Sequence, residues 1–451
     1  MMGQLSARGH ELTAHPGEAD VLVVNTCSFI DPAKKESVDT ILEMAEYKRV
    51  GRAKRLVVAG CLVERYRGDI RKDMPEVDAV IGTNEIDRIV AVCEGIDDPA
   101  PADTGLYLYH DLTPRVLATP RHYAYMKIAE GCDHPCTFCV IPQYRGKFRS
   151  RRFESVISEA TRLFRQGVRE INLIGQDTTC YGEDFGLKDG LATLLGRLAQ
   201  IETPQEKWVR FLYAYPNKVT QKLLDTIAEH AALVKYIDMP LQHASAPVLK
   251  RMKRGASGDI FLKLIERIRR TIPGIAIRTS FIAGFPGETD ADFQALCDFV
   301  KAAQFDRLGV FSYSDEDTSG SYALDGKVDG RTINNRKRTL MAIQRRISRA
   351  RNRQMVGNEV AVLVEGPSAD TDLLWQARMS TQAPEIDGVV LINDVEGAPP
   401  QAGQMRPLRI TETHDYDIIG TLLPAAEGEV RVSAPPPHLI GITVPSQLPA
   451  R

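Results

Sequence analysis

The stretch EGCDHPCTFCVIPQYRGKFRSR, residues 130–151, decides how the rest of the chain is interpreted. It contains three of the chain's eight cysteines, Cys132, Cys136 and Cys139, in the spacing C-x3-C-x2-C. The apolar run YAYMKIA directly before it predicts a β-strand, so we expect the cysteines on a loop at that strand's carboxyl end. Binding and catalytic groups gather at this edge of α/β folds. The stretch therefore predicts a metal-binding loop on an α/β domain.

Three cysteines at this spacing favour a 4Fe–4S cluster with one open iron. Such clusters normally take four thiolates, so three leave one iron without a protein ligand. An open position is typical of a catalytic metal centre, because a chelating substrate can receive an electron there. Zinc is the alternative, and it needs a fourth ligand. His134 is the nearby candidate, but it lies between two of the cysteines and is poorly placed to reach the same ion.

The whole chain is long enough for several domains. Its 451 residues indicate two or three of them, and its composition, 43% hydrophobic and 26% charged, is ordinary. The net charge of −2 argues against general nucleic-acid binding. No apolar run is long enough for a membrane helix, and the polar start MMGQLSARGHEL does not resemble a signal peptide. We therefore expect a cytoplasmic protein that does not associate with a membrane and has no disulfide bonds.

Apolar and helical stretches alternate along most of the chain. Residues 1–98 contain three apolar runs that predict a small parallel α/β domain, and the Pro-rich residues 99–118 predict a linker. Residues 119–355 predict an open or closed parallel β/α barrel. Its nine basic residues without an acid at 331–355 predict the solvated face of a long helix. The barrel's six strand candidates are 123–131, 168–175, 209–216, 234–240, 276–285 and 307–314.

The pattern changes after the barrel. Four β-rich runs in residues 356–422 predict a small antiparallel barrel. Six prolines in residues 423–451 predict a disordered tail. The four runs are 359–366, 373–379, 388–394 and 405–411.

The cysteine spacing followed by VIPQYRGKFRSR resembles the radical S-adenosylmethionine methylthiotransferase family. The resemblance extends from about residue 3 to about 422 and includes several further motifs. It implies a flavodoxin-like parallel α/β domain, a central partial (open) radical-SAM β/α barrel and a C-terminal TRAM or OB-like barrel. The matching motifs are VREINLIGQDTT (168–179), MPLQHAS (239–245), VLKRMKR (248–254) and RTSFIAGFPGET (278–289).

The resemblance also implies a cofactor site. The amino and carboxylate groups of S-adenosylmethionine would chelate the open iron of the cluster. Gly284 and Gly287 would let the backbone approach the adenine closely. For each residue of this site, packing at a strand end is the alternative. The other motif residues expected to line the cofactor are Gln176, Gln242, His243, Ser245 and Arg278.

Cys27 and Cys61 each end a strand candidate, VVNTC and VVAGC. Parallel strands that end together would place both thiols on one edge, and two unrelated buried cysteines are the alternative. The resemblance implies a second 4Fe–4S cluster held by three cysteines, of which Cys27 and Cys61 match the second and third. The family's first cysteine-bearing strand is absent, so we expect a late start or a truncation, an exposed sheet edge and a site with two ligands.

The family has two branches that differ in substrate. One modifies adenosine in transfer RNA, and the other modifies an aspartate of the small-subunit ribosomal protein near the decoding centre. QDTTCYG (176–182) and WQARMSTQAPEIDGVV (375–390) resemble the second branch. Residues 356–422 contain eleven acids and three arginines, which gives 3 − 11 = −8. This charge would repel RNA and attract a basic protein, and solubility is the alternative reason for it.

The resemblance implies a sequence of three steps. The Cys132, Cys136 and Cys139 cluster would reduce S-adenosylmethionine and release a 5′-deoxyadenosyl radical. The radical would take a hydrogen from the β-carbon of the aspartate, and a methylated sulfur held at the second cluster would be transferred to that carbon. A flavodoxin or ferredoxin would supply electrons, and we expect no tRNA partner. The alternatives are a tRNA adenosine methylthiotransferase and a catalytically impaired ribosome-associated protein.

Overall fold

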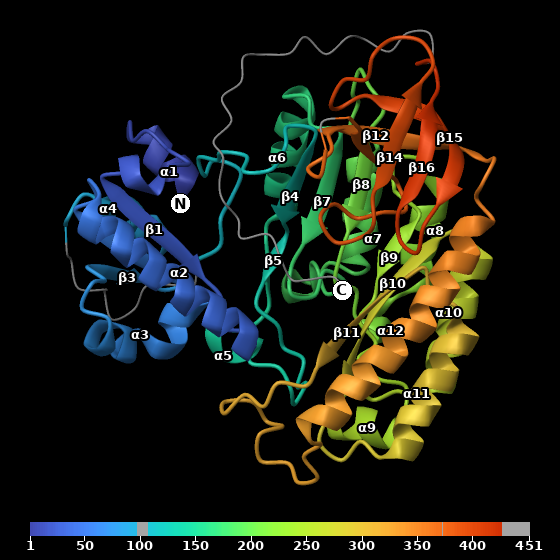
Figure 1. Cartoon of the computed structure of the whole chain (residues 1–451), viewed down its shortest axis with the longest axis horizontal. Helices are drawn as coiled ribbons and strands as arrows, with labels where there is room; N and C mark the ends of the chain where they lie inside the picture. Colours follow the sequence, from blue (N-terminus) through green and yellow to red (C-terminus); the bar gives the residue numbers. More distant parts are fainter. Residues whose placement is uncertain (97–106, 372, 426–451) are drawn as a thin grey trace.

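The computed structural model describes residues 1–96, 107–371 and 373–425, which form three parts (Figure 1). Residues 99–106 of the predicted linker and 426–451 of the predicted tail lie outside the described residues. Among the helices that the structure describes, none is long and apolar enough to cross a membrane.

The N-terminal part is a parallel three-stranded sheet between two layers of helices. Its strand order is β1-β2-β3, and alternate side chains of each strand point to opposite faces. Leu22 and Leu56 pack in the core that contains Ile41 and Ile70, whereas Val57 packs on the other face with α1 and α4 residues. The elements are α1 (Met2–Ala7), β1 (Val21–Thr26), α2 (Asp31–Val50), β2 (Arg55–Gly60), α3 (Cys61–Asp73), β3 (Ala79–Ile81) and α4 (Ile89–Cys93).

The central part is a six-stranded partial barrel. Two parallel sheets, β4-β7-β8 and β9-β10-β11, meet at a parallel bridge between Val209 and Leu233. No pairing joins β4 to β11 within the described residues, so the barrel is open. All six predicted strands are present. They are β4 (Tyr123–Lys127), β7 (Glu170–Ile174), β8 (Trp208–Phe211), β9 (Tyr236–Asp238), β10 (Ala276–Ala283) and β11 (Arg307–Ser312).

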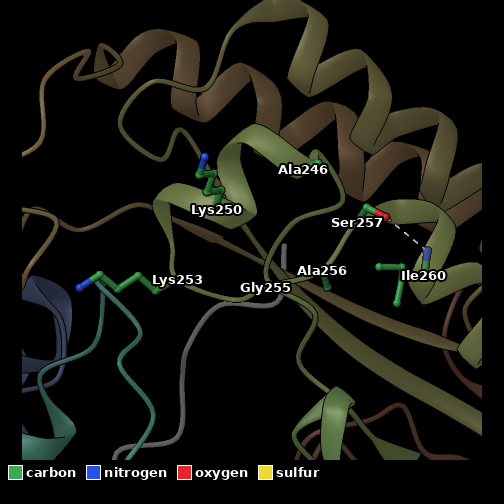
Figure 2. Close-up of a pocket in the computed structure, with 7 residues that line it drawn as sticks. All are labelled: Ala246, Lys250, Lys253, Gly255, Ala256, Ser257 and Ile260. Carbon is green, nitrogen blue, oxygen red and sulfur yellow. Dashed lines mark hydrogen bonds between the residues drawn. The ribbon is translucent and has the colours of Figure 1, made fainter.

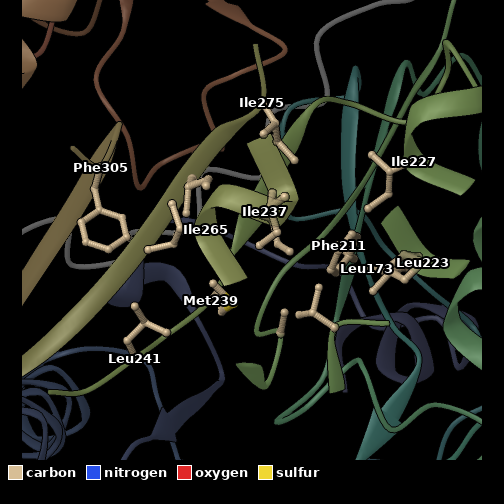
Figure 3. Packing of buried hydrophobic residues seen from close by; sticks show 14 of the residues in the cluster. Leu173, Phe211, Leu223, Ile227, Ile237, Met239, Leu241, Ile265, Ile275 and Phe305 are labelled. Atoms are coloured by element: carbon tan, nitrogen blue, oxygen red, sulfur yellow. The ribbon is translucent and has the colours of Figure 1, made fainter. Parts of the chain in front are cut away.

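Helices cover the outside of the open barrel, and the basic helix α12 packs on β11 and α11. Strand residues such as Leu173, Phe211 and Ile237 fill the core against helix residues such as Leu223 and Ile265 (Figure 3). A two-residue pair, β5 (Ala129–Glu130) and β6 (Arg149–Ser150), frames the cysteine loop. The helices are α5 (Ile141–Arg145), α6 (Phe153–Arg165), α7 (Gly190–Ala199), α8 (Gln221–Glu229), α9 (Ala246–Arg251), α10 (Gly258–Thr271), α11 (Asp290–Ala303) and α12 (Gly330–Arg353).

The C-terminal part is a closed barrel in the order β12-β13-β14-β16-β15. It differs from the sequence prediction in two ways. A fifth strand, at 418–422, was not predicted, and it pairs with β14 in parallel rather than antiparallel. The strands are β12 (Glu359–Pro367), β13 (Trp375–Met379), β14 (Val390–Val395), β15 (Met405–Thr413) and β16 (Ile418–Leu422).

The C-terminal barrel seals the end of the central barrel where its strands begin. The buried carboxylate of Glu170, the first residue of β7, accepts from Arg210 of β8 at 2.9 Å and from Arg378 of β13 at 2.6 Å. The hydroxyl of Tyr236, which starts β9, donates to Asp387 at 2.8 Å. The opposite end, where the strands finish, therefore carries the cysteine loop.

Three acids of the C-terminal barrel make contacts inside the protein. Glu365 accepts from Arg378 at 2.6 Å, and Asp415 pairs with Arg349 of α12 at 2.5 Å. Asp387 is bound by Tyr236. Asp415 pairs with an arginine outside the barrel, whereas Arg378 is already included in the count of −8. The attraction of a basic partner to this barrel therefore stays a prediction.

Candidate active site

The three clustered cysteines lie between β5 and α5, on the loop predicted for them. The amide of Cys132 donates to the Gly146 carbonyl at 3.2 Å, and the amide of Cys139 donates to the Cys136 carbonyl at 3.1 Å. Burial, with a smaller contribution from nearby Cys136, raises the pKa of Cys132 to about 11 and that of Cys139 to about 12. Cysteine thiolates are the usual protein ligands of iron–sulfur clusters, and three cysteines on one short loop fit such a cluster.

His134 fastens the cysteine loop. Its Nε2 lies 2.6 Å from a carboxylate oxygen of Asp177, and its ring stacks on Tyr215 with 3.7 Å between centroids. Cys180 donates to the same carboxylate at 3.1 Å. His134, Asp177 and Cys180 could share a metal ion by distance, but their ligand atoms already contact one another. Asp177 and Tyr215 thus hold His134, which ties the cysteine loop to the segments that follow β7 and β8.

Arg254 is a site residue that the sequence reasoning missed. Its guanidinium lies over the Tyr215 ring, 4.3 Å from the centroid, and donates to the Cys136 sulfur at 3.6 Å. It also donates to the Pro240 carbonyl at 2.5 Å. Arg254 ends the motif VLKRMKR, so the motif offered a signal for it, whereas nothing in the sequence singled out Tyr215.

Two of the predicted cofactor residues lie near the ends of the strands. The side-chain oxygen of Gln176 accepts from the Gly131 amide at 2.8 Å, which ties the end of β7 to the cysteine loop. Gln242 is half-buried, has a positive φ of 71° and forms a bridge with Phe281 of β10. Both residues are at the edge where the sequence placed them.

The next three predicted cofactor residues make contacts inside the protein. His243 is fully buried, so its side chain does not line an open cavity, and its Nδ1 accepts from the Ser245 amide at 3.0 Å. The Ser245 hydroxyl donates to Asp292 at 2.5 Å. Arg278 is bound to Asp238 at 2.6 Å.

The two glycines expected beside the adenine are required by the protein's own packing. Gly284 has a φ of 79°, and a Cβ there would lie 2.2 Å from Cγ1 of Ile333. Gly287 has a φ of 84°, and its Cβ would lie 2.7 Å from Nε of Arg251. A side chain of this protein thus lies where each Cβ would be placed, and the approach of an adenine to these two glycines stays a prediction.

An open cavity of about 460 Å³ lies where α9 and α10 face each other (Figure 2). None of the predicted site residues lines it. Its lining is Ala246, Lys250, Lys253, Gly255, Ala256, Ser257 and Ile260.

Cys27 and Cys61 lie on one edge of the N-terminal sheet, as predicted. Each follows a residue of the register pair Thr26 and Gly60, so the two parallel strands end together. The Arg145 guanidinium donates to the Cys61 sulfur at 3.1 Å. Burial raises the pKa of the Cys61 thiol, Arg145 opposes this rise, and nearby Cys27 adds to it.

Polar contacts fasten the N-terminal part beside the cysteine loop, where α3 contacts α5 (Figure 1). Glu316, which follows β11, accepts from Lys34 at 2.8 Å and from Arg65 at 2.7 Å. The Thr83 hydroxyl donates to the Tyr144 carbonyl of α5 at 3.1 Å. These contacts hold the edge with Cys27 and Cys61 against the segment that follows the clustered cysteines.

Comparison with known proteins gives a family for each part of the chain. Residues 1–82 match Uncharacterized protein family UPF0004, residues 126–300 match the Radical SAM superfamily, and residues 356–423 match the TRAM domain. Among solved structures, the radical S-adenosylmethionine methyltransferase TsrM from Kitasatospora setae is similar in fold. It has a TM-score of 0.50 at 16% identity, over 65% of this chain and 62% of that chain.

Curated relatives match almost the full length. A protein of Solibacter usitatus is 82% identical over 95% of this chain and 92% of its own length, and one of Koribacter versatilis is 57% identical over 94% and 93%. Both are named ribosomal protein uS12 methylthiotransferase RimO, as is a relative from Sorangium cellulosum at 45% identity over 98% and 91%. The chain is an enzyme and belongs to the radical S-adenosylmethionine methylthiotransferase family, in the branch of these relatives.

Proposed function

We propose that this enzyme adds a methylthio group to the β-carbon of an aspartate in ribosomal protein uS12, in the cytoplasm. The observation that carries the proposal is the juxtaposition of two cysteine sites in a chain whose relatives are named for this activity. Family membership implies S-adenosylmethionine and one 4Fe–4S cluster, for which Cys132, Cys136 and Cys139 are the proposed ligands. Cys27 and Cys61 are the proposed protein ligands of a second cluster.

The bound cofactors would supply radical chemistry and sulfur, and the protein would supply binding and orientation. Gln176 and His134 hold the cysteine loop in place through Gly131 and Asp177. Arg254 donates to the Cys136 sulfur and so helps to orient this cysteine. Gln242, at the end of the barrel that carries this loop, remains the best-placed predicted residue for contact with S-adenosylmethionine.

The proposal is tested with anaerobically reconstituted enzyme, S-adenosylmethionine and a reduced flavodoxin or ferredoxin as electron donor. Purified uS12 and bulk tRNA are offered in separate reactions, and both products are analysed by mass spectrometry. We expect a methylthio group on one aspartate of uS12 and none on tRNA. Methylthiolated adenosine in tRNA with unmodified uS12 would overturn the substrate.

Iron content tests the second cluster separately. About eight irons per reconstituted chain are expected if Cys27 and Cys61 hold a second 4Fe–4S cluster, and about four if they do not. A Cys61→Ala variant should fall to about four irons, while Cys297→Ala, which removes a buried cysteine of α11, should keep the wild-type value.

A further inference from the structure

One side chain touches both cysteine sites. Arg145 is the last residue of α5, and it follows the clustered cysteines in the chain. Its Nη2 donates to the sulfur of Cys61 at 3.1 Å, and its Nη1 donates to Glu130 at 2.9 Å. The side chain is 25% exposed, so the domain contact shields most of it from water.

Arg145 is tied to the loop of the clustered cysteines from two directions. Glu130, in β5, directly precedes that loop and also pairs with Lys127 at 2.5 Å. The carbonyl of Gly146, next to Arg145 in the chain, accepts from the Cys132 amide at 3.2 Å. A displacement of Arg145 would therefore move Cys61 relative to Cys132.

The charge on Arg145 also matters for a metal group at Cys61. A guanidinium that donates to a ligand sulfur stabilises the more negative, reduced state of an iron–sulfur cluster, and so raises its reduction potential. Arginine is suited to both roles, because its planar fork serves two acceptors in different directions. A lysine ammonium provides the charge without that geometry.

We propose that Arg145 is a positioning residue that couples the two cysteine sites. It holds the Cys61 sulfur at a fixed place relative to the loop of Cys132, Cys136 and Cys139, and it raises the reduction potential of the cluster bound at Cys61. The inference rests on the proposed function, which assigns Cys61 to a second cluster.

The test uses the full reconstituted chain and the variants Arg145→Gln and Arg145→Lys. Lys147→Gln is the matched control, because Lys147 is an exposed cation in the same segment. The first measurement is the midpoint potential of the second cluster, titrated with detection by electron paramagnetic resonance. The second is the amount of methylthiolated uS12 formed per 5′-deoxyadenosine released, which reports on coupling between the sites.

Arg145→Gln should lower the midpoint potential and reduce the product ratio roughly tenfold, the loss typical of residues that orient metal ligands. Arg145→Lys should keep most of the potential but still lose product ratio, and Lys147→Gln should match the wild type. An Arg145→Gln variant with the wild-type potential and ratio would overturn the inference.

Two further outcomes are decisive. If Arg145→Gln fails to fold, the product ratio of Arg145→Lys tests the positioning role instead. A wild-type ratio in that variant would refute the role. If the wild type itself holds only about four irons, the proposed second cluster is refuted. That failure is separate, because it is seen without any variant.

Discussion

At the scale of single residues, a stack of side chains supports the cysteine loop. The ring of His134 is nearly parallel to that of Tyr215, at 9°, and the Arg254 guanidinium also lies over Tyr215. Asp177 fixes the other side of His134. Its pKa is lowered although burial alone would raise it, because His134, Thr179 and Cys180 donate to its carboxylate. The stack therefore joins the segments that follow β7, β8 and α9 to the loop.

Removal of the Tyr215 ring should loosen this loop. Aromatic stacking and the cation–π contact together indicate that Tyr215→Leu lowers the free energy of unfolding by about 2 kcal/mol. The variant should also lose iron faster during dialysis. Tyr215→Phe keeps the ring and is the control, with an expected change below about 0.5 kcal/mol. Equal effects of the two substitutions in urea denaturation would show that the stack is unimportant.

His243 predicts a pH dependence of stability. Burial lowers the pKa of His243 from 6.5 to about 4; Asp292 opposes this shift, and Arg336 adds to it. The Glu288 carboxylate lies 3.9 Å from Nε2 of the ring. In the unfolded chain His243 binds a proton below pH 6.5, whereas in the folded chain it binds one only below about pH 4. Stability should therefore fall as the pH drops through this window.

The variant His243→Asn isolates this effect, because asparagine can still accept from the Ser245 amide but does not titrate. Between about pH 7 and about pH 4.5, the wild type should lose about 2 kcal/mol more free energy of unfolding than the variant. The measurement is urea denaturation of the metal-free chain at both pH values. Parallel losses in the two proteins would contradict a neutral buried His243.

At the scale of elements, the sequence predicted what local periodicity controls. The ends of β1 and β2 placed Cys27 and Cys61 on one edge because parallel strands in register end together. Strand β16 was missed because its partners, β14 and β15, are not apparent from its own short pattern. The packing of Gly284 was also not apparent from the sequence, since Ile333 reaches it from the distant helix α12.

Two glycines with nearly equal φ angles allow the cost of backbone strain to be measured apart from the cost of side-chain crowding. Gly284 and Gly274 have φ values of 79° and 78°, but only Gly284 has a neighbour, Ile333, where a Cβ would be placed. Gly274→Ala should cost about 1 kcal/mol from the backbone alone. Gly284→Ala should cost about 3 kcal/mol, because overpacking is added. Equal losses in denaturant titrations would contradict the packing of Ile333 against this turn.

At the scale of the whole molecule, the C-terminal barrel is part of the central barrel's structure. Glu170 is completely buried and neutralises Arg210 and Arg378, which come from two different domains. The acidic composition of this barrel was predicted to attract a basic substrate. Glu365 and Asp387 of that barrel also make internal contacts, and the choice of uS12 rests on the motifs and the relatives.

Glu170→Gln should therefore weaken the association of the two barrels. It leaves two buried arginines without their full counter-charge, at an expected cost of about 3 kcal/mol or more. Glu183→Gln removes a half-exposed partner of Lys218 and should cost less than about 1 kcal/mol. Thermal unfolding of both variants is the measurement, and a Glu170→Gln variant as stable as Glu183→Gln would contradict the docking role.

The central claim is that the site of Cys132 is needed to cleave S-adenosylmethionine and the site of Cys61 is needed to transfer the methylthio group. One comparison tests this claim most directly. Wild type, Cys61→Ala and Cys132→Ala are reconstituted and given S-adenosylmethionine, reductant and uS12, and both 5′-deoxyadenosine and modified uS12 are quantified. We expect both products from the wild type, only 5′-deoxyadenosine from Cys61→Ala and neither from Cys132→Ala. Methylthiolated uS12 from Cys61→Ala at the wild-type level would contradict the claim.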